Sequence, residues 1–230
     1  MPCYDISRSY PIGGDALSRL IDLSLDFPDQ APVYPGDTPS RLLQAKTIDE
    51  DGYTAFILQT GLHVGTHLDS PLHFRQNGAM VADLPLETFL GKGRLLDVRG
   101  EGVVGLESNY DSQIKQGDIV LFWTGHSATY GTDAYYHDHP VLHEDWADFL
   151  IKKRVKLVGF DLPSPDAPPF PMHRKLLGAG IPLMENLTNL GELVGWREFE
   201  VMAFPLKIRA EGSPVRVVAR ECLFHGEKLS

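Results

Sequence analysis

Residues 63–73 have the sequence HVGTHLDSPLH, which places three of the nine histidines and one aspartate within eleven residues. Neutral imidazole and carboxylate are the usual ligands of a catalytic divalent transition metal, which keeps one position open for water. A single histidine is more often a surface or core residue than a ligand. Three histidines with an interposed carboxylate, between an apolar run and a proline, are much harder to explain as scaffold. The stretch therefore predicts a metal site.

The spacing of His63 and His67 restricts how this stretch can fold. In an extended strand, at roughly 3.3 Å per residue, the two residues would lie about 13 Å apart, near the limit for two imidazoles on one ion. Residues four apart on a helical turn are only about 5–6 Å apart at Cβ. We therefore expect a turn of helix or a tight loop, in which Gly65 allows close backbone approach. Pro71 disfavours helix at the residue before it and should direct His73 back toward the same pocket.

Composition bounds the class of protein. The chain has 230 residues, of which 43% are hydrophobic and 23% charged, and this predicts a globular domain with a substantial core. A formal net charge of −10 without a basic run argues against a nucleic-acid partner, because phosphate binding needs a basic patch. The two cysteines, Cys3 and Cys222, are far apart, which predicts a reducing compartment. No window reaches the ~18 apolar residues of a membrane span, so we expect a cytoplasmic protein without a membrane partner.

The order of patterns along the chain predicts one α/β domain over residues 20–230. Residues 1–19 precede it as a tail, or as an arm that packs on a neighbouring subunit. A helix at 144–153 followed by a strand at 155–160 is typical of an αβ unit. A proline-rich loop after residue 160 should shape a site. Further strands are expected at 20–25, 53–62, 94–98 and 118–123, with a closing hairpin of 203–208 and 215–219 around a turn at 212–214.

Other polar residues admit two interpretations each. Glu185 follows the apolar run 181–184, where an unpaired buried carboxylate would be costly, but it could also face solvent on an edge strand. His173 alone would be an unremarkable surface histidine. Asp161 could orient a ligand imidazole or cap a turn. The HxHxxxH pattern of residues 137–143 could bind metal, although a polar loop is the more common explanation.

Several stretches resemble the cyclase family of metal-dependent hydrolases, which includes bacterial kynurenine formamidases and isatin hydrolases. Residues 63–73 match its signature HxGTHxDxPxH. The resemblance covers roughly residues 20–220, too much for an accidental match of one motif. The other matching blocks are PVYPGD at 32–37, WTG at 123–125, GFDLPS at 159–164, HRKLL at 173–177, IPLMENL at 181–187, PLK at 205–207 and GSPVR at 212–216.

The resemblance implies a fold and a set of ligands. The fold is a swivelling β/β/α-type domain with a central mixed sheet or partly closed barrel, assembled as a homodimer or homotetramer. Residues matching His63, His67 and Asp69 hold one metal ion in the family's binuclear members. Those matching His173 and Asp69 hold the second, and Glu185 takes the position of a bridging or shared carboxylate. Because some relatives have glutamine there and one metal, glutamate favours two divalent ions, zinc or alternatively manganese.

The resemblance also implies roles at His73 and Tyr34. His73 matches the residue with an acid–base role, and imidazole suits that role because its ordinary pKa is near 6.5. Tyr34 matches a substrate-contacting aromatic position, where kynurenine formamidases characteristically have tryptophan. The predicted reaction is hydrolysis of a C–N bond in a small amide, an N-formyl arylamine or a cyclic amide, by metal-bound hydroxide.

Other functions stay open at this point. Within hydrolases, the alternative is a lactone or cyclic-imide (isatin-type) hydrolase, since ring opening uses the same steps. Outside them, the chain could be a non-catalytic metal- or ligand-binding relative, or its metal could be purely structural with all ligand positions closed. The sequence contains no glycine-rich phosphate loop and no GxSxG elbow, which disfavours nucleotide and serine-hydrolase chemistry.

Overall fold

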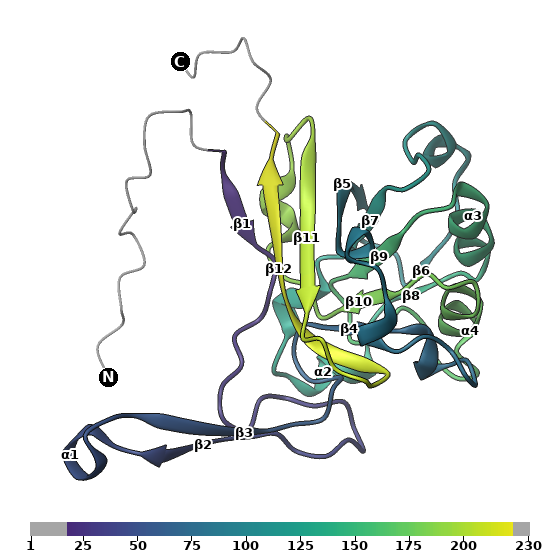
Figure 1. Ribbon diagram of the computed structural model, residues 1–230. Helices are drawn as coiled ribbons and strands as arrows, with labels where there is room; N and C mark the ends of the chain where they lie inside the picture. Colours follow the sequence, from purple (N-terminus) through teal and green to yellow (C-terminus); the bar gives the residue numbers. More distant parts are fainter. Residues whose placement is uncertain (1–17, 223–230) are drawn as a thin grey trace.

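The computed structural model of the chain describes residues 18–222 (Figure 1). The tail or arm expected at residues 1–19 therefore lies, but for its last two residues, outside the described part of the chain. Within residues 18–222, no helix has the length and apolar character needed to cross a membrane.

Seven strands close into a mixed barrel. They follow the order β12-β11-β5-β7-β9-β10-β4, and β4 pairs back onto β12. The run from β5 to β10 is parallel, whereas β4, β11 and β12 pair antiparallel with their neighbours. A further strand, β1 (Leu20–Asp22), adds to β12 outside the ring. The barrel strands are β4 (His67–Asp69), β5 (Leu90–Asp97), β7 (Ile119–Trp123), β9 (Leu157–Phe160), β10 (Leu183–Glu185), β11 (Phe199–Pro205) and β12 (Gly212–Glu221).

Apolar side chains on both faces of the strands build two cores. Successive strand residues point to opposite faces. In β7, Ile119 and Leu121 therefore join the core that the barrel encloses. Val120 and Phe122 join the core beneath helices α3 (Asp145–Lys153) and α4 (Pro171–Gly178). Both faces of β7 are buried, as its apolar run indicates for a covered parallel strand.

The remaining elements are short. They include the helices α1 (Ile48–Asp51) and α2 (Asp133–His137) and the two-residue strands β6 (Val103–Val104) and β8 (Val141–Leu142). The 3₁₀ turns are η1 (Pro71–His73), η2 (Val81–Asp83), η3 (Leu86–Phe89), η4 (Ser108–Ser112), η5 (His126–Thr129) and η6 (Leu190–Leu193). The described chain is thus an α/β protein with a closed mixed barrel, the fold class that the resemblance implied.

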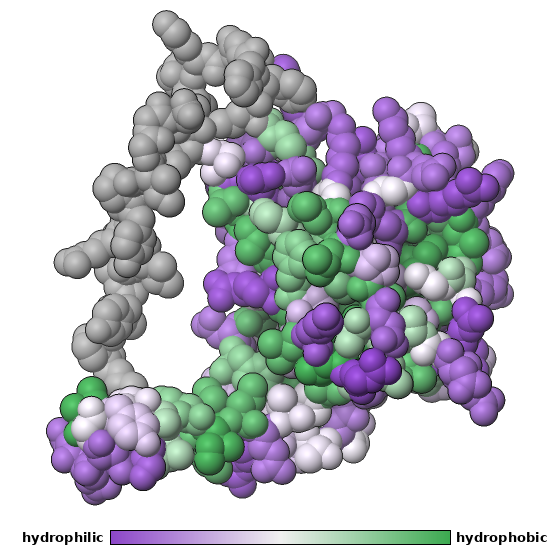
Figure 2. Space-filling model, viewed as in Figure 1, coloured by the Kyte–Doolittle hydropathy of each residue, from purple (hydrophilic) through white to green (hydrophobic). Residues whose placement is uncertain are grey.

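A two-stranded ribbon extends from the body of the molecule (Figure 1). It consists of β2 (Arg41–Lys46) and β3 (Ala55–Gln59), with α1 at the tip. Among the described strands, these two pair only with each other. The β3 residues Phe56, Ile57 and Leu58 are 55%, 58% and 51% exposed, so both faces are open. Figure 2 shows the resulting apolar surface along the ribbon. The strand expected at 53–62 is present in shorter form, but its partner and its exposure were not anticipated.

The turn of the closing hairpin was predicted wrongly. Residues 212–214 do not turn; they are the first residues of β12 and pair with β4. The connection between β11 and β12 instead runs over residues 206–211. A Cβ atom at Gly212 would lie 2.9 Å from Cε1 of His63, so glycine here lets β12 pass close to that imidazole.

Candidate functional site

The signature stretch folds as a tight loop followed by a strand. Residues 62–66 form turns and bends, and Gly65 has a φ of +63°, a conformation that favours glycine. The loop alternative was therefore correct, and the helical turn was not. Ser70 is extended, with φ −95° and ψ 164°, and Pro71 then opens the turn η1 that contains His73. The His73 ring returns to 4.3 Å from the His63 ring, between centroids.

The register of β4 with β10 puts three ligand-type side chains on one face. His67 and Asp69 are two residues apart in β4 and so point the same way. Glu185 of β10 lies directly opposite His67, and cross-strand neighbours share a face. The intervening Leu68 points into the barrel core. Glu185 is only 5% exposed, so it does not face solvent on an edge strand.

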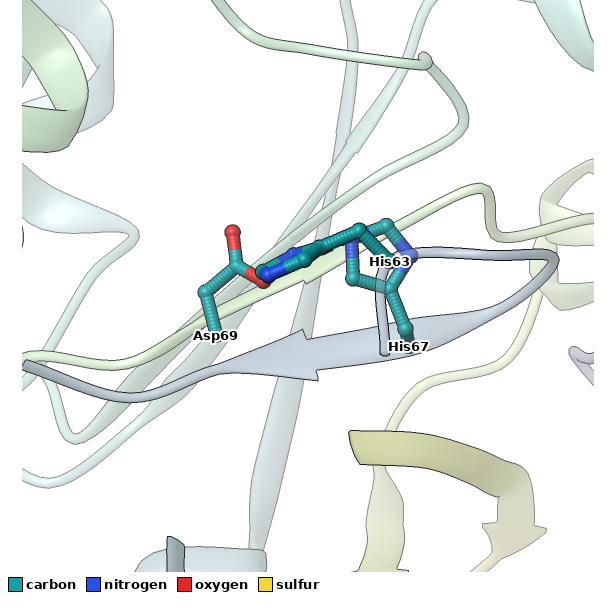
Figure 3. Close-up of side chains that lie close together, drawn as sticks. All are labelled: His63, His67 and Asp69. Atoms are coloured by element: carbon teal, nitrogen blue, oxygen red, sulfur yellow. Dashed lines mark ion pairs between the residues drawn. The ribbon is translucent and has the colours of Figure 1, made fainter. Parts of the chain in front are cut away.

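The first group of converging side chains contains His63, His67 and Asp69 (Figure 3). Nδ1 of His63 lies 2.8 Å from Oδ1 of Asp69, and Nε2 of His67 lies 3.4 Å from the same oxygen. One ligand atom from each residue lies within 4.8 Å of the other two. The loop and the strand thus bring together three donors that could hold one cation.

The second group contains Asp69, His173 and Glu185 and shares the Asp69 carboxylate with the first. His173 comes from α4, and its Nε2 lies 3.7 Å from Oδ2 of Asp69 and 3.1 Å from Oε1 of Glu185. The other Glu185 oxygen lies 3.4 Å from Nε2 of His67. One carboxylate is therefore common to both groups, and a second spans them.

The donor atoms fit a cation-binding role. Buried polar atoms normally have hydrogen-bond partners. Within residues 18–222, several buried polar atoms lie close together without a hydrogen bond of good geometry: Nε2 of His63 and His67, both carboxylate oxygens of Asp69, and Oε1 of Glu185. Imidazole nitrogens and carboxylate oxygens that converge in this way satisfy one another only through a shared proton or a bound cation. The set is of the type that zinc and manganese accept.

The carboxylates and imidazoles of the cluster shift one another's pKa more strongly than burial does. Burial would raise the pKa of Asp69, but the neighbouring imidazoles outweigh burial and hold that pKa well below its usual range. Burial would lower the pKa of His63, but the Asp69 carboxylate outweighs it and raises the pKa to about 9. The pKa of His173 is raised in the same way against burial, chiefly by Asp166. Without a cation these imidazoles retain protons, which a metal must displace.

Asp166, not Asp161, is the carboxylate that supports a ligand-type imidazole. Oδ1 of Asp166 lies 2.6 Å from Nδ1 of His173. Asp161 instead accepts hydrogen bonds from the backbone N–H groups of Thr124 and Gly125, each at 2.8 Å, and from the Thr124 hydroxyl. The turn-capping interpretation of Asp161 therefore holds. Asp166 was missed, although it lies in the proline-rich loop that was expected to shape a site.

The clusters open into a cavity of about 270 Å³. Of the predicted site residues, all except Asp69 line it, and Asp69 lies buried behind them. Partial burial lowers the pKa of His73, which favours a neutral imidazole at pH 7. Four aromatic side chains surround the cavity, and only the first of these was predicted: Tyr34, Phe74, Tyr136 and Phe170.

The histidines at 137, 139 and 143 take no part in this site. Among residues 18–222, the groups of side chains that could hold a metal include none of them. Tyr136, which precedes the first of these histidines in α2, does reach the cavity and meets Tyr34 edge-to-face, with ring centroids 6.0 Å apart. No local sequence pattern predicts this contact, because the two tyrosines are about a hundred residues apart and only the fold brings them together.

Comparison with known proteins agrees with this geometry. The Cyclase family model matches residues 21–167, more than half of the chain. A kynurenine formamidase of Bacillus cytotoxicus is 31% identical over 209 residues, which cover 88% of this chain and 98% of the relative. Isatin hydrolase A from Ralstonia solanacearum has a TM-score of 0.80 at 23% identity, covering 89% of this chain and 92% of that one.

A second solved structure extends the comparison. Isatin hydrolase A from Labrenzia aggregata, bound to benzyl benzoate, has a TM-score of 0.77 at 27% identity, covering 89% of this chain and 94% of that one. The fold, the extent of the sequence match and the clustered ligand-type residues all lead to one assignment. The chain belongs to the Cyclase family.

Proposed function

We propose that this protein is a metal-dependent hydrolase that cleaves the C–N bond of a small amide. The observation that carries the proposal is the convergence of ligand-type atoms without hydrogen-bond partners at the floor of a cavity with aromatic walls. Kynurenine formamidases and isatin hydrolases, the relatives described above, both act on C–N bonds that are not peptide bonds. Their similarity over most of the chain supports the same reaction class here.

A divalent cation is the cofactor, and we propose two ions, of zinc or alternatively manganese. His63, His67 and Asp69 would hold one, and Asp69, His173 and Glu185 the other. Glu185 supports two ions because its two oxygens face different imidazoles, His67 and His173. When bound, such an ion lowers the pKa of water toward ~7 and polarises a carbonyl group.

His73 is proposed to move the proton. It lines the cavity beside His63 but belongs to neither candidate metal group. Its lowered pKa leaves the imidazole neutral near pH 7, so it can accept a proton from the attacking water. The resulting imidazolium can then donate that proton to the leaving nitrogen, which would otherwise depart as an unstable amide anion.

The walls of the cavity favour a substrate with an aryl group. Tyr34 and Tyr136 line the cavity as an edge-to-face pair, and Phe74 and Phe170 form a second pair with ring centroids 5.6 Å apart. Aromatic rings prefer such offset or edge contacts with another ring. An N-formyl arylamine fits this description. A cyclic aryl amide is the second candidate, supported by the isatin hydrolases among the structural relatives.

Metal analysis joined to a hydrolysis screen tests the proposal. Purified protein should contain divalent metal and hydrolyse at least one of N-formylkynurenine, isatin, cyclic imides or lactones, and a chelator should abolish that activity. Cleavage of the lactones alone would favour the lactonase alternative. Stoichiometric metal with no hydrolysis of any substrate would instead indicate a non-catalytic metal-binding relative.

The exposed ribbon supports a homo-oligomer, proposed here as a dimer. A two-stranded ribbon is at best marginally stable alone in water, and exposed apolar surface of this kind usually marks an interface. His63 lies four residues after β3 ends. Packing of the ribbon against a second copy of the chain would therefore also limit the movement of the His63 side chain. A Phe56→Asp, Leu58→Asp variant should be monomeric by light scattering, whereas the control Leu86→Asp, at a 69% exposed residue of the body, should not. A monomeric wild type would refute the proposal.

The expected cytoplasmic location stays a prediction.

A further inference from the structure

We propose that the two candidate metal positions have separate supports, with Asn186 and Tyr135 positioning His67 and Asp166 positioning His173. The inference rests on the proposed metal-dependent function. It concerns residues that hold the ligand side chains in place and do not themselves bind the metal. None of these three residues belongs to either group that could hold a metal. Asp166 contacts the His173 imidazole, and Asn186 contacts the His67 imidazole and the carbonyl oxygen that this imidazole faces.

The first support begins at the carbonyl of Gly65. Nδ1 of His67 lies 2.9 Å from this oxygen, which can only accept, so Nδ1 must carry the ring proton. Nε2 of His67 is then the nitrogen left to bind a metal, and it faces the Asp69 and Glu185 carboxylates. Fixing one ring nitrogen in this way sets the tautomer that a metal requires at the other.

Asn186 holds that carbonyl in place. Its Nδ2 also donates to Gly65 O, at 2.9 Å, and its Oδ1 accepts from the Tyr135 hydroxyl at 2.7 Å. The amide orientation is unambiguous, because an oxygen facing the Gly65 carbonyl would be repelled. The main-chain oxygen of Asn186 accepts a hydrogen bond from the Thr66 hydroxyl at 2.6 Å. Asn186 therefore makes a second contact with the loop that contains Gly65. Tyr135 is fully buried and Asn186 is 6% exposed, so water cannot replace either partner easily.

The second support is a carboxylate rather than a carbonyl. Oδ1 of Asp166 lies 2.6 Å from Nδ1 of His173, and Oδ2 accepts from the backbone N–H groups of Met172 and His173. Asp166 thereby fixes both the ring of His173 and the first turn of the helix that carries it. It is 3% exposed. An ionised acceptor raises the basicity of the imidazole more than a carbonyl does, so the two positions differ in character as well as in location.

Metal titration can separate the two supports without using activity. The metal-free protein and its variants would be titrated with cobalt(II), followed by its visible absorption, and with zinc against a chromophoric chelator. Asp166→Asn should weaken the position at His173 by about 10–100-fold. Tyr135→Phe acts on His67 only through Asn186 and the Gly65 carbonyl, so it should weaken the position at His67 by about tenfold, the low end of that range. In each variant the other position should change less than about threefold.

Single-site backgrounds identify which position has changed. In His173→Ala, only the group of His63, His67 and Asp69 is complete, so adding Tyr135→Phe should lower the remaining affinity and adding Asp166→Asn should not. In His63→Ala the pattern should reverse. Tyr135→Phe removes one hydroxyl and keeps the ring, so it tests the proposal even if Asp166→Asn fails to fold.

The chain offers a matched control for each variant. Asp161→Asn alters another fully buried carboxylate of the same loop, one bonded to Thr124 and Gly125 rather than to an imidazole. Tyr130→Phe removes a buried hydroxyl that has no hydrogen-bond partner in the described part of the chain. Both controls should retain wild-type metal affinity. The proposal is overturned if Asp161→Asn weakens metal binding as much as Asp166→Asn, or if either support variant weakens both positions equally. A wild type that binds no metal would defeat the proposed function itself.

Discussion

Raising the pH of the metal-free protein should destabilise it, and part of this loss should come from His63. Burial opposes protonation of this imidazole, but the Asp69 carboxylate 2.8 Å away outweighs it and raises the pKa from 6.5 to about 9. Between these two values the folded protein binds more protons than the unfolded chain, so the free energy of unfolding falls as the pH rises. The shift corresponds to on the order of 3 kcal/mol, fully present below pH 6.5 and lost by pH 9.

Urea unfolding at a series of pH values, with a chelator present, would measure this loss. The control is His63→Gln, whose amide can still donate to Asp69 but does not titrate. From pH 6.5 to 9, the wild type should lose on the order of 3 kcal/mol more than this variant. A zinc-induced rise in melting temperature should grow over the same range, because fewer protons then compete with the metal. Parallel stability profiles for the wild type and His63→Gln would refute the reasoning.

Four substitutions test the assigned roles. His73→Ala should retain its metal yet lose at least about a hundredfold in kcat, the low end for acid–base catalysis; unchanged turnover of a reactive amide would exclude the role. Asp69→Ala removes the carboxylate common to both groups and should lose metal and activity together, so full metal content by elemental analysis would contradict it. Glu185→Gln leaves one acceptor oxygen and should reduce bound metal from two equivalents to one, measured in the same way. Tyr136→Ala should raise KM for aryl amides roughly 2–10-fold, as the loss of a ring contact of about 0.5–1.5 kcal/mol implies, while KM for N-methylformamide stays constant.

The ligand-bearing stretch could be predicted because its constraints are local. His63, His67 and Asp69 lie within seven residues, and Gly65 and Pro71 limit the backbone conformations between and after them. Those limits predicted the extended residue before the proline and the return of the His73 ring, but they left both a helical turn and a tight loop open for residues 63–67. His173 could not be placed in this way, because its link to Asp69 depends on how α4 packs against the barrel.

Features set by tertiary packing escaped prediction for identifiable reasons. Gly-Ser-Pro at 212–214 is a typical turn sequence, yet the glycine is there because β12 passes against the His63 ring. The apolar run in β3 has the composition of a core strand, and nothing local shows that its side chains would be exposed. Asp161 and Asp166 lie in the same loop, and only the fold determines which of them meets an imidazole.

The core of the barrel fixes the backbone positions of the ligands on β4 and β10. Asp69 and Glu185 are both buried carboxylates, and bringing them together is unfavourable unless a cation or imidazolium lies between them. The pairing of β4 with β10 keeps the two carboxylates together. The strand β4 has only three residues, and it also pairs with β12, which closes the ring. A shift of one residue would turn Leu68 out of the core and both β4 ligands into it. The cost of exposing that leucine therefore fixes the register, and the register in turn places the ligands.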